Sequence, residues 1–382
     1  MPPRVAILPP VPVPYREPLF RALFERGRVH PHVIYLAASQ PGWDQPSGWF
    51  SEAAGYPSEI LSGWQHGRPG RSPITLPRGI GRALSRFRPD SIISWEYGPA
   101  TLRVLAWARR RTVPVIVFSE LTPWSGDALS GLQHRLHRLV APRAAGFIVA
   151  SSQGVERLRS LGVPAERVEV ALQSAELSSL RPASPGPDGP VRIVAVGRLV
   201  PDKNLDVLID AFADARFAGG EAELEIRGAG PLEGELRARA DRLGVPVRFP
   251  GAVASGELAG VYAQAHALAL VSTYEPFGVT LREAAAAGLP LIASRRAGAV
   301  GDIAVDGENA LVIDPGDRAS ITDALLRIVR EPELRERLGA GSRAVTERHP
   351  LEADVEAWER AVTSLARGSQ PARRTSGSRR RP

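Results

Sequence analysis

The residues best suited to chemistry lie in two loops in the second half of the chain. The first loop, 197–204, reads GRLVPDKN and sets Arg198 and Lys203 five residues apart, behind Gly197. Lys203 is the only lysine among 382 residues. A planar guanidinium and a mobile ammonium at the mouth of a helix suit a diphosphate, because a helix N-terminus itself favours an anion. The alternative is a surface turn with solvated charges.

The second loop, 272–283, reads STYEPFGVTLRE and carries two carboxylates. We expect Glu275 in the loop itself and Glu283 about one and a half turns inside the next helix, at 3.6 residues per turn. That helix would begin with the free N–H groups of Gly278, Val279 and Thr280. A carboxylate can accept hydrogen bonds from two sugar hydroxyls at once. Taken singly, each acid could instead be a helix-dipole or surface residue.

Short apolar runs alternate with helical patterns on both sides of a proline-rich stretch, and these elements must position the two loops. The run 191–196 precedes the first loop, and 267–271 precedes the second. Such alternation indicates parallel sheets with crossover helices. We predict an α/β protein of two doubly wound, Rossmann-like domains facing a cleft. The predicted parts are a domain over 1–180, a linker over 181–190, a domain over 191–350, a helix over 351–366 and a disordered basic tail over 367–382.

Composition excludes several classes of protein. The chain has no cysteine, so disulfide scaffolds and thiolate catalysis are excluded. Residues 1–180 carry 21 arginines against 13 acids, whereas 181–366 carry 21 basic residues against 28 acids and the tail adds six arginines. The net charge of +7 therefore does not indicate a nucleic-acid binder. Without a membrane-length apolar run or a signal-peptide pattern, we expect a cytoplasmic protein.

The two loops together resemble a known family. GRLVPDKN followed by EPFGVTLRE looks like the donor-binding half of GT-B glycosyltransferases of the large retaining group, family 4. The second motif matches that family's E-x7-E pattern at Glu275 and Glu283. The resemblance is strong over about 191–317 and weak over 1–180. It implies GT-B architecture, with an acceptor-binding N-terminal domain, a nucleotide-sugar-binding C-terminal domain, and a closing helix that crosses back onto the first domain.

The resemblance also implies roles for individual residues. The diphosphate of a nucleotide-sugar donor would be held by Arg198, Lys203 and the N–H groups of Phe277, Gly278, Val279 and Thr280. Glu283 would bind the ribose, and Glu275 the donor sugar or its reacting face. Residues 227–230, with Gly228 and Gly230, and 250–253 would surround the base. Glu275, Arg198 and Lys203 are the predicted catalytic residues, with retention of configuration and with no cofactor and no metal.

Three places depart from the family's pattern. The first N-terminal loop, PPVPVPYRE, lacks a glycine pair and offers Tyr15 and Arg16, where Arg16 could add a phosphate contact. The loop FSELTPW offers Glu120 where many members have a histidine. Tyr15, Arg16 and Glu120 are therefore the acceptor-side candidates. A Gly-Gly-x-x-Glu run near the sugar becomes AGAVGD, ending in Asp302.

Other interpretations remain open. His134 and His137 lie three apart in a basic helical stretch, for which a solvated polar face is expected and contact with an anionic acceptor or the inner membrane face is the alternative. The sequence leaves the acceptor open between a glycan, a lipid-linked sugar and a small molecule. A non-catalytic sugar-nucleotide-binding homologue and a GT-B epimerase or phosphorylase are competing functions. A nicotinamide dehydrogenase is disfavoured, because the spacing of Gly228, Gly230 and Gly234 is one residue too long.

Overall fold

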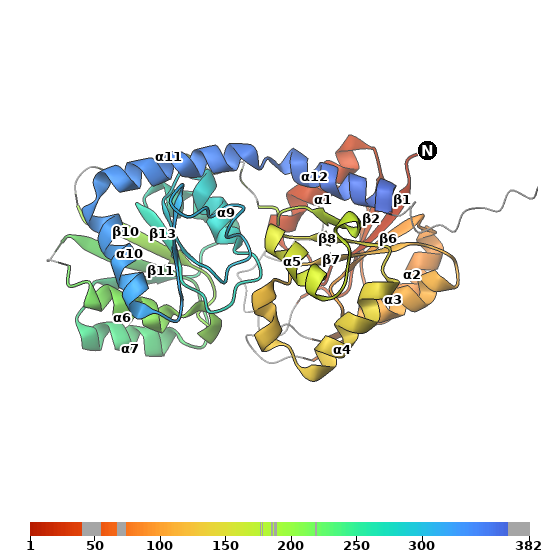
Figure 1. The fold of residues 1–382 in the computed structure, drawn as a ribbon, viewed down its shortest axis with the longest axis horizontal. Helices are drawn as coiled ribbons and strands as arrows, with labels where there is room; N and C mark the ends of the chain where they lie inside the picture. The colour runs from red at the N-terminus through yellow and green to blue at the C-terminus, as the bar shows by residue number, and fades with distance from the viewer. Residues whose placement is uncertain are drawn as a thin grey trace, which may run out of the picture.

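The chain forms two parallel sheets, each with helices on both faces, at the two ends of an elongated molecule (Figure 1). This computed structural model describes residues 1–39, 55–66, 74–217 and 220–365, except 176, 178, 185, 187 and 188. The predicted tail lies outside these residues. Along β1 (Arg4–Leu8), Val5 and Ile7 join one apolar cluster and Ala6 and Leu8 another, as expected for a strand buried on both faces. The predicted fold class is confirmed.

The first sheet has seven strands in the order β3-β2-β1-β6-β7-β8-β9, all parallel. After β1, these strands are β2 (His30–Tyr35), β3 (Ser58–Ile60), β6 (Ser91–Trp95), β7 (Val115–Ser119), β8 (Gly146–Val149) and β9 (Val168–Val170). The helices are α1 (Glu17–Arg26), α2 (Ile80–Phe87), α3 (Pro99–Arg109), α4 (Gly131–Val140) and α5 (Ser152–Ser160). A separate antiparallel pair joins β4 (Gly63–His66) to β5 (Ile74–Pro77).

The second sheet has six parallel strands in the order β12-β11-β10-β13-β14-β15. They are β10 (Val191–Val196), β11 (Ala222–Arg227), β12 (Val247–Gly251), β13 (Ala267–Leu270), β14 (Leu291–Ser294) and β15 (Ala310–Ile313). The helices are α6 (Leu205–Asp214), α7 (Glu233–Leu243), α8 (Leu258–Ala263), α9 (Val279–Ala286), α10 (Arg318–Arg330) and α11 (Pro332–Arg348). The order reverses between β10 and β13, as it does between β1 and β6 in the first sheet. Ligands of such sheets bind beyond the strand ends at that reversal.

The chain crosses between the domains twice. After α11, Pro350 starts α12 (Leu351–Arg360), which continues as a π-helical turn and lies beside α1 in Figure 1. Trp358 of α12 is 1% exposed and its ring lies 6.0 Å from that of Phe20. The end of the chain's described part is therefore built into the core of the first domain.

One buried arginine contacts both crossings. Arg282 of α9 is 2% exposed, and its guanidinium donates to the carbonyl oxygens of Gln173 and His349 at 2.8 and 2.9 Å. It also pairs with Asp354 of α12 at 2.8 Å. The segment that leaves the first domain after β9, the turn between α11 and α12, and α12 itself thus all contact the Arg282 side chain.

Two helices have ends with identifiable physical causes. Helix α11 continues through Gly339 and Gly341 to Arg348. A Cβ at Gly339 would lie 2.8 Å from the Gly288 carbonyl oxygen, so this glycine allows close packing rather than ending the helix. Helix α8 begins at Leu258, because Ser255–Glu257 before it form a 3₁₀ turn.

Candidate active site

The first predicted loop leaves β10 at the reversal of the second sheet, pressed against the loop after β11. The Gly197 N–H donates to the Arg227 carbonyl oxygen at 2.9 Å, and the Leu199 N–H donates to that of Ala229 at 3.0 Å. A Cβ on Gly228 would lie 1.8 Å from the Gly197 carbonyl oxygen, and one on Gly230 2.4 Å from that of Leu199. Both glycines are required by this close approach, which fixes the backbone around Arg198.

Lys203 turns back from the start of α6 toward the second loop. Its Nζ forms an ion pair with the Glu275 carboxylate, and Ser272 Oγ lies 3.5 Å from the same carboxylate oxygen. The preceding turn is held by Asn204, whose side chain is buried and donates to the carbonyl oxygens of Val271 and Pro315. Gly197, Arg198, Lys203 and Ser272 line one hollow. The structure therefore brings Arg198, Lys203 and Glu275 together.

The charges in this hollow interact with one another. Partial burial lowers the pKa of Arg198, while the neighbouring acids Glu275 and Asp202 oppose that change. Tyr15 of the first domain, like these acids, raises the pKa of Arg198. The hollow therefore combines two cations with one carboxylate and adjoins the other domain.

Helix α9 begins at the same edge. Gly278 precedes it with φ 98°, a left-handed conformation that favours glycine, and the first N–H groups of α9 at Val279 and Thr280 have no partner within the helix. The loop is fixed by N–H groups of Gly298 and Ala299, which donate to the carbonyl oxygens of Glu275 and Phe277 at 3.0 and 2.8 Å. The Phe277 side chain is 2% exposed and belongs to the core, so any contact with a ligand falls to its backbone.

Glu283 lies on α9 next to a buried tyrosine. Tyr262 of α8 is 0% exposed, and its hydroxyl donates to Glu283 Oε2 at 2.8 Å. Desolvation raises the pKa of Glu283 to about 7, although this hydrogen bond counteracts the rise. The carboxyl group therefore changes charge near neutral pH.

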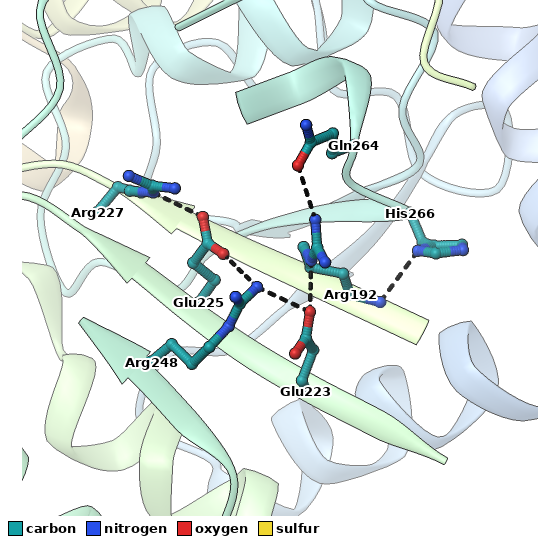
Figure 2. A network of polar contacts seen from close by, with 7 residues as sticks. All are labelled: Arg192, Glu223, Glu225, Arg227, Arg248, Gln264 and His266. Atoms are coloured by element: carbon teal, nitrogen blue, oxygen red, sulfur yellow. Dashed lines mark hydrogen bonds and ion pairs between the residues drawn. The ribbon is translucent and has the colours of Figure 1, made fainter. Parts of the chain in front are cut away.

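A lattice of charged side chains covers the sheet face beside the end of β11 (Figure 2). Glu225 accepts hydrogen bonds from Arg227 and Arg248 at 2.6 Å each, and Glu223 pairs with Arg192 and Arg248. A polar cavity of about 340 Å³ adjoins this lattice and is lined in part by Arg227, Val253 and Glu257. Arg227, expected near a base, is thus held at its Nε by a nearly buried carboxylate.

In the first domain, Arg16 lies close to Glu120. Arg16 is 5% exposed, its Nη2 lies 2.9 Å from Glu120 Oε1, and its guanidinium stacks 4.5 Å from the Trp95 ring. Arg16 is thus paired with a carboxylate of its own domain, as Lys203 is with Glu275, and its contact with a phosphate stays a prediction. Glu120 also donates its N–H to Glu96 Oε1 at 2.6 Å.

The carboxylate of Asp302, in the second domain, forms hydrogen bonds with the first domain. Asp302 accepts hydrogen bonds from the N–H of Ser152 at 2.8 Å and from its hydroxyl at 2.5 Å, at the start of α5. Gln153 donates to the carbonyl oxygens of Ala297 and Val300. The loop over 297–302 is thus fastened to the first domain.

The prediction that His134 and His137 lie on a solvated face of α4 is wrong for His137. His137 is 5% exposed, and its ring lies 4.2 Å from that of Tyr97. Two leucines of the same helix instead face solvent, since Leu132 is 67% and Leu139 40% exposed.

Among the residues that the structure describes, no three His, Cys, Asp or Glu side chains lie close enough to hold a metal ion. No helix in these ranges has the length and apolar character needed to cross a bilayer.

Two family patterns match most of the chain. The family described as "Glycosyl transferases group 1" matches residues 178–345, and "Glycosyl transferase 4-like domain" matches 12–171. Together they cover both sheets and both predicted loops. The chain belongs to the group 1 glycosyltransferases. Its fold is GT-B, as the resemblance implied.

Relatives and solved structures agree with this assignment. The chain is 28% identical to sulfoquinovosyl transferase SQD2 of Arabidopsis thaliana over 77% of this chain and 59% of that protein. It is also 28% identical to a glycogen synthase of Mycobacterium tuberculosis, over 73% of this chain and 68% of the relative. Anabaena Alr3699/HepE in complex with UDP and glucose is 19% identical, with a TM-score of 0.76 over 95% of this chain and all of that one. At that identity the likeness shows the fold alone.

Four important residues were missed in the sequence, namely Glu96, Glu223, Glu225 and Arg282. Glu96 directly follows the buried run SIISW, so its place at a strand end was available as a signal. The charged lattice has a signal too, because Glu223, Glu225 and Arg227 alternate along β11. Arg282 had none, since its partners lie 67 to 109 residues away.

Proposed function

We propose that this group 1 glycosyltransferase transfers a sugar from a nucleotide-diphosphate sugar to an acceptor hydroxyl, with retention of configuration and without a divalent metal. The observation that carries the proposal is that Arg198 and Lys203 line one hollow at the reversal of the second sheet, with Glu275 paired to Lys203 and α9 beginning at the same sheet edge. Cations and unpaired N–H groups at such a point suit a diphosphate.

The catalytic contribution would be stabilisation of the leaving group. As the bond from the sugar to the diphosphate breaks, negative charge grows on the phosphate oxygens. Arg198 and Lys203, with the N–H groups of Val279 and Thr280, would neutralise that charge from fixed positions. Because these cations would neutralise the phosphate charge themselves, that role would not need a metal ion, which supports the proposal of metal independence.

The two carboxylates would orient the donor. Glu283 in its ionised form would accept hydrogen bonds from the ribose hydroxyls. Glu275 would hold Lys203 toward the phosphates and contact the donor sugar; it is not assigned as a nucleophile. Phe277 and Gly278 would contribute backbone, and Gly197, Gly228 and Gly230 allow the loop packing that positions Arg198.

The experiment that tests this function is a thermal-shift panel of UDP, GDP and ADP with their glucose, galactose and mannose derivatives, because a ligand of the folded state raises the melting temperature. One nucleotide diphosphate should give a shift that Lys203→Ala abolishes. Glu235→Gln, at an exposed position of α7, is the matched control. The absence of a shift with every nucleotide would refute the proposal. Product NMR would report retention, and unchanged turnover in EDTA would report metal independence.

We also propose cytoplasmic localisation with peripheral contact to the inner face of the membrane. Helix α4 exposes Leu132 and Leu139 beside Arg135 and Arg138, a mixture that suits an anionic lipid surface. Flotation with anionic vesicles at low salt should carry the protein upward, and Leu132→Ser with Leu139→Ser should reduce that fraction. Equal flotation of this variant would refute the contact.

A further inference from the structure

The first domain holds one loop of the second domain through the start of α5, which lies on the side that faces the second domain (Figure 1). Ser152, the first residue of α5, donates its N–H and its hydroxyl to the Asp302 carboxylate at 2.8 and 2.5 Å. Gln153 donates its side-chain amide to two carbonyl oxygens of the same loop, over 297–302, at 3.0 and 3.1 Å. Two neighbouring residues of the first domain therefore fix the position of this loop.

The loop over 297–302 in turn holds the backbone of the loop that carries Glu275. The Gly298 N–H donates to the Glu275 carbonyl oxygen at 3.0 Å, and the Ala299 N–H donates to that of Phe277 at 2.8 Å. A Cβ on Gly298 would lie 2.0 Å from the Pro276 carbonyl oxygen, so the two backbones are in direct contact. A displacement of the first loop would therefore displace Glu275.

The path between the domains is buried and closely packed. Ala297 and Ala299 are 0% exposed and Asp302 is 9% exposed. On the other side of the contact, a Cβ on Gly154 would lie 2.7 Å from Val149 Cβ, so the start of α5 packs directly on β8. Interiors packed in this way have low compressibility and transmit strain. The position of β8 in the first domain is therefore passed on to the loop over 297–302.

A second contact reaches the same two loops from the turn after β7. The Tyr274 hydroxyl, one residue before Glu275, lies 3.1 Å from Ser125 Oγ. The Arg296 guanidinium, one residue before the loop over 297–302, lies 5.5 Å from the centre of the Trp124 ring. Strand β7 lies beside β8 in the first sheet. Two adjacent strands of the first domain thus place residues against both loops.

We propose that Ser152 and Gln153 are positioning residues for the donor site. Through the loop over 297–302 they would set the position of Glu275 and of Lys203, which is paired with it. This inference rests on the proposed transferase function. Charged groups held in place before the nucleotide arrives need less reorganisation on binding. The coupling is reciprocal, because whatever the contact with α5 adds to nucleotide affinity, the bound nucleotide adds to that contact.

Calorimetric titration with UDP, GDP and ADP tests the effect on binding. The double variant Ser152→Ala/Gln153→Ala removes the side-chain contacts and should weaken binding of the nucleotide that the wild type prefers by about fivefold or more, as is typical of coupled sites. Ser152→Thr keeps the hydroxyl group and should restore the wild-type affinity. Ser160→Ala is the matched control, because this exposed serine at the other end of α5 bonds only within its own helix.

Amide hydrogen exchange tests the coupling in both directions, since it reports local opening. In the nucleotide-free double variant, the amides of Gly298 and Ala299 should exchange faster than in the wild type. In the wild type, a saturating amount of the preferred nucleotide should slow exchange of the Ser152 amide, although this amide belongs to the other domain. Asp302→Ala should abolish that response. A merely structural contact would not respond to the nucleotide.

The outcomes separate this inference from the donor function. Unchanged affinity, or unchanged exchange at Gly298 and Ala299, in a double variant that melts like the wild type would overturn the inference and leave the donor function standing. If the double variant does not fold, Ser152→Ala and Gln153→Ala are tested singly by the same two measurements. A wild-type chain that binds none of the three nucleotides would refute the donor function and the inference with it.

Discussion

Glu283, which we propose binds the ribose of the donor, should destabilise the folded chain above neutral pH. Below pH 4.5 the carboxyl group is protonated in both the folded and the unfolded chain, and the two states bind equal numbers of protons. Between pH 4.5 and about 7 only the unfolded chain ionises, so stability falls as the pH rises. Above pH 7 the folded chain carries the full cost, about 3 kcal/mol at about 1.4 kcal/mol per pH unit.

Replacing Glu283 by glutamine removes this cost. The amide can still accept the Tyr262 hydroxyl but never becomes charged, so Glu283→Gln should stabilise the chain by up to about 3 kcal/mol at pH 8 and by less than about 1 kcal/mol at pH 5. Urea unfolding followed at both pH values measures the difference. The exposed Glu235→Gln should change stability by less than about 0.5 kcal/mol at either pH. A Glu283→Gln variant that is less stable than the wild type at pH 8 would refute this reasoning.

The same substitution should cost function. An ionised Glu283 is needed to accept ribose hydroxyls, so the affinity for the nucleotide should fall as the pH drops below about 7, and in Glu283→Gln it should be weak at every pH. Tyr262→Phe removes a hydrogen bond to the charged form, worth about 1.5–3 kcal/mol, and should move the midpoint upward by about one to two pH units. Calorimetric titration from pH 5.5 to 9 distinguishes these cases. An affinity independent of pH in the wild type would remove Glu283 from the ribose site.

Other substitutions test the remaining parts of the donor site and the contacts of Arg282 at the two crossings between the domains. Lys203→Ala should weaken binding of the nucleotide diphosphate that gives the thermal shift by roughly 10- to 100-fold in calorimetry, as expected for a charge-assisted contact, and an unchanged affinity would contradict its role. Gly228→Ala should lower the melting temperature and abolish nucleotide binding because its Cβ would overlap a backbone carbonyl, whereas Gly234→Ala, with open space around it, should do neither. Arg282→Leu should destabilise the chain by about 3–5 kcal/mol by leaving Asp354 buried without its partner, and adding Asp354→Leu should recover part of that loss in urea unfolding.

The donor side could be predicted from the sequence because its parts are local. Each loop follows a buried strand directly, and the strand order places both strand ends at one edge of the sheet. Arg198, Lys203, Glu275 and Glu283 could therefore be named, although the sequence could not show that Lys203 pairs with Glu275. That pair joins residues 72 positions apart, and its geometry depends on how β10 and β13 align.

The first domain could be predicted only in outline. Its doubly wound sheet follows from the apolar runs, but the contact between Arg16 and Glu120 spans 104 residues and depends on the neighbouring positions of three strands. Burial, which encloses Arg16 and raises the pKa of Glu96, is a property of the packed domain rather than of any local pattern. Tyr15 and Glu120 could still be chosen, because the family resemblance pointed to the two loops that carry them.

The altered run over 297–302 connects the two halves of the site. A carboxylate near the donor sugar could have accepted hydrogen bonds from sugar hydroxyls. Asp302 instead accepts two hydrogen bonds at the start of α5, where the helix dipole favours a negative charge. The same loop donates N–H groups to the backbone of Glu275 and Phe277. A displacement of α5 would therefore be transmitted through this loop to Glu275. The donor loop and the first domain are linked here, so separation of the domains would break the contacts of both Asp302 and Gln153.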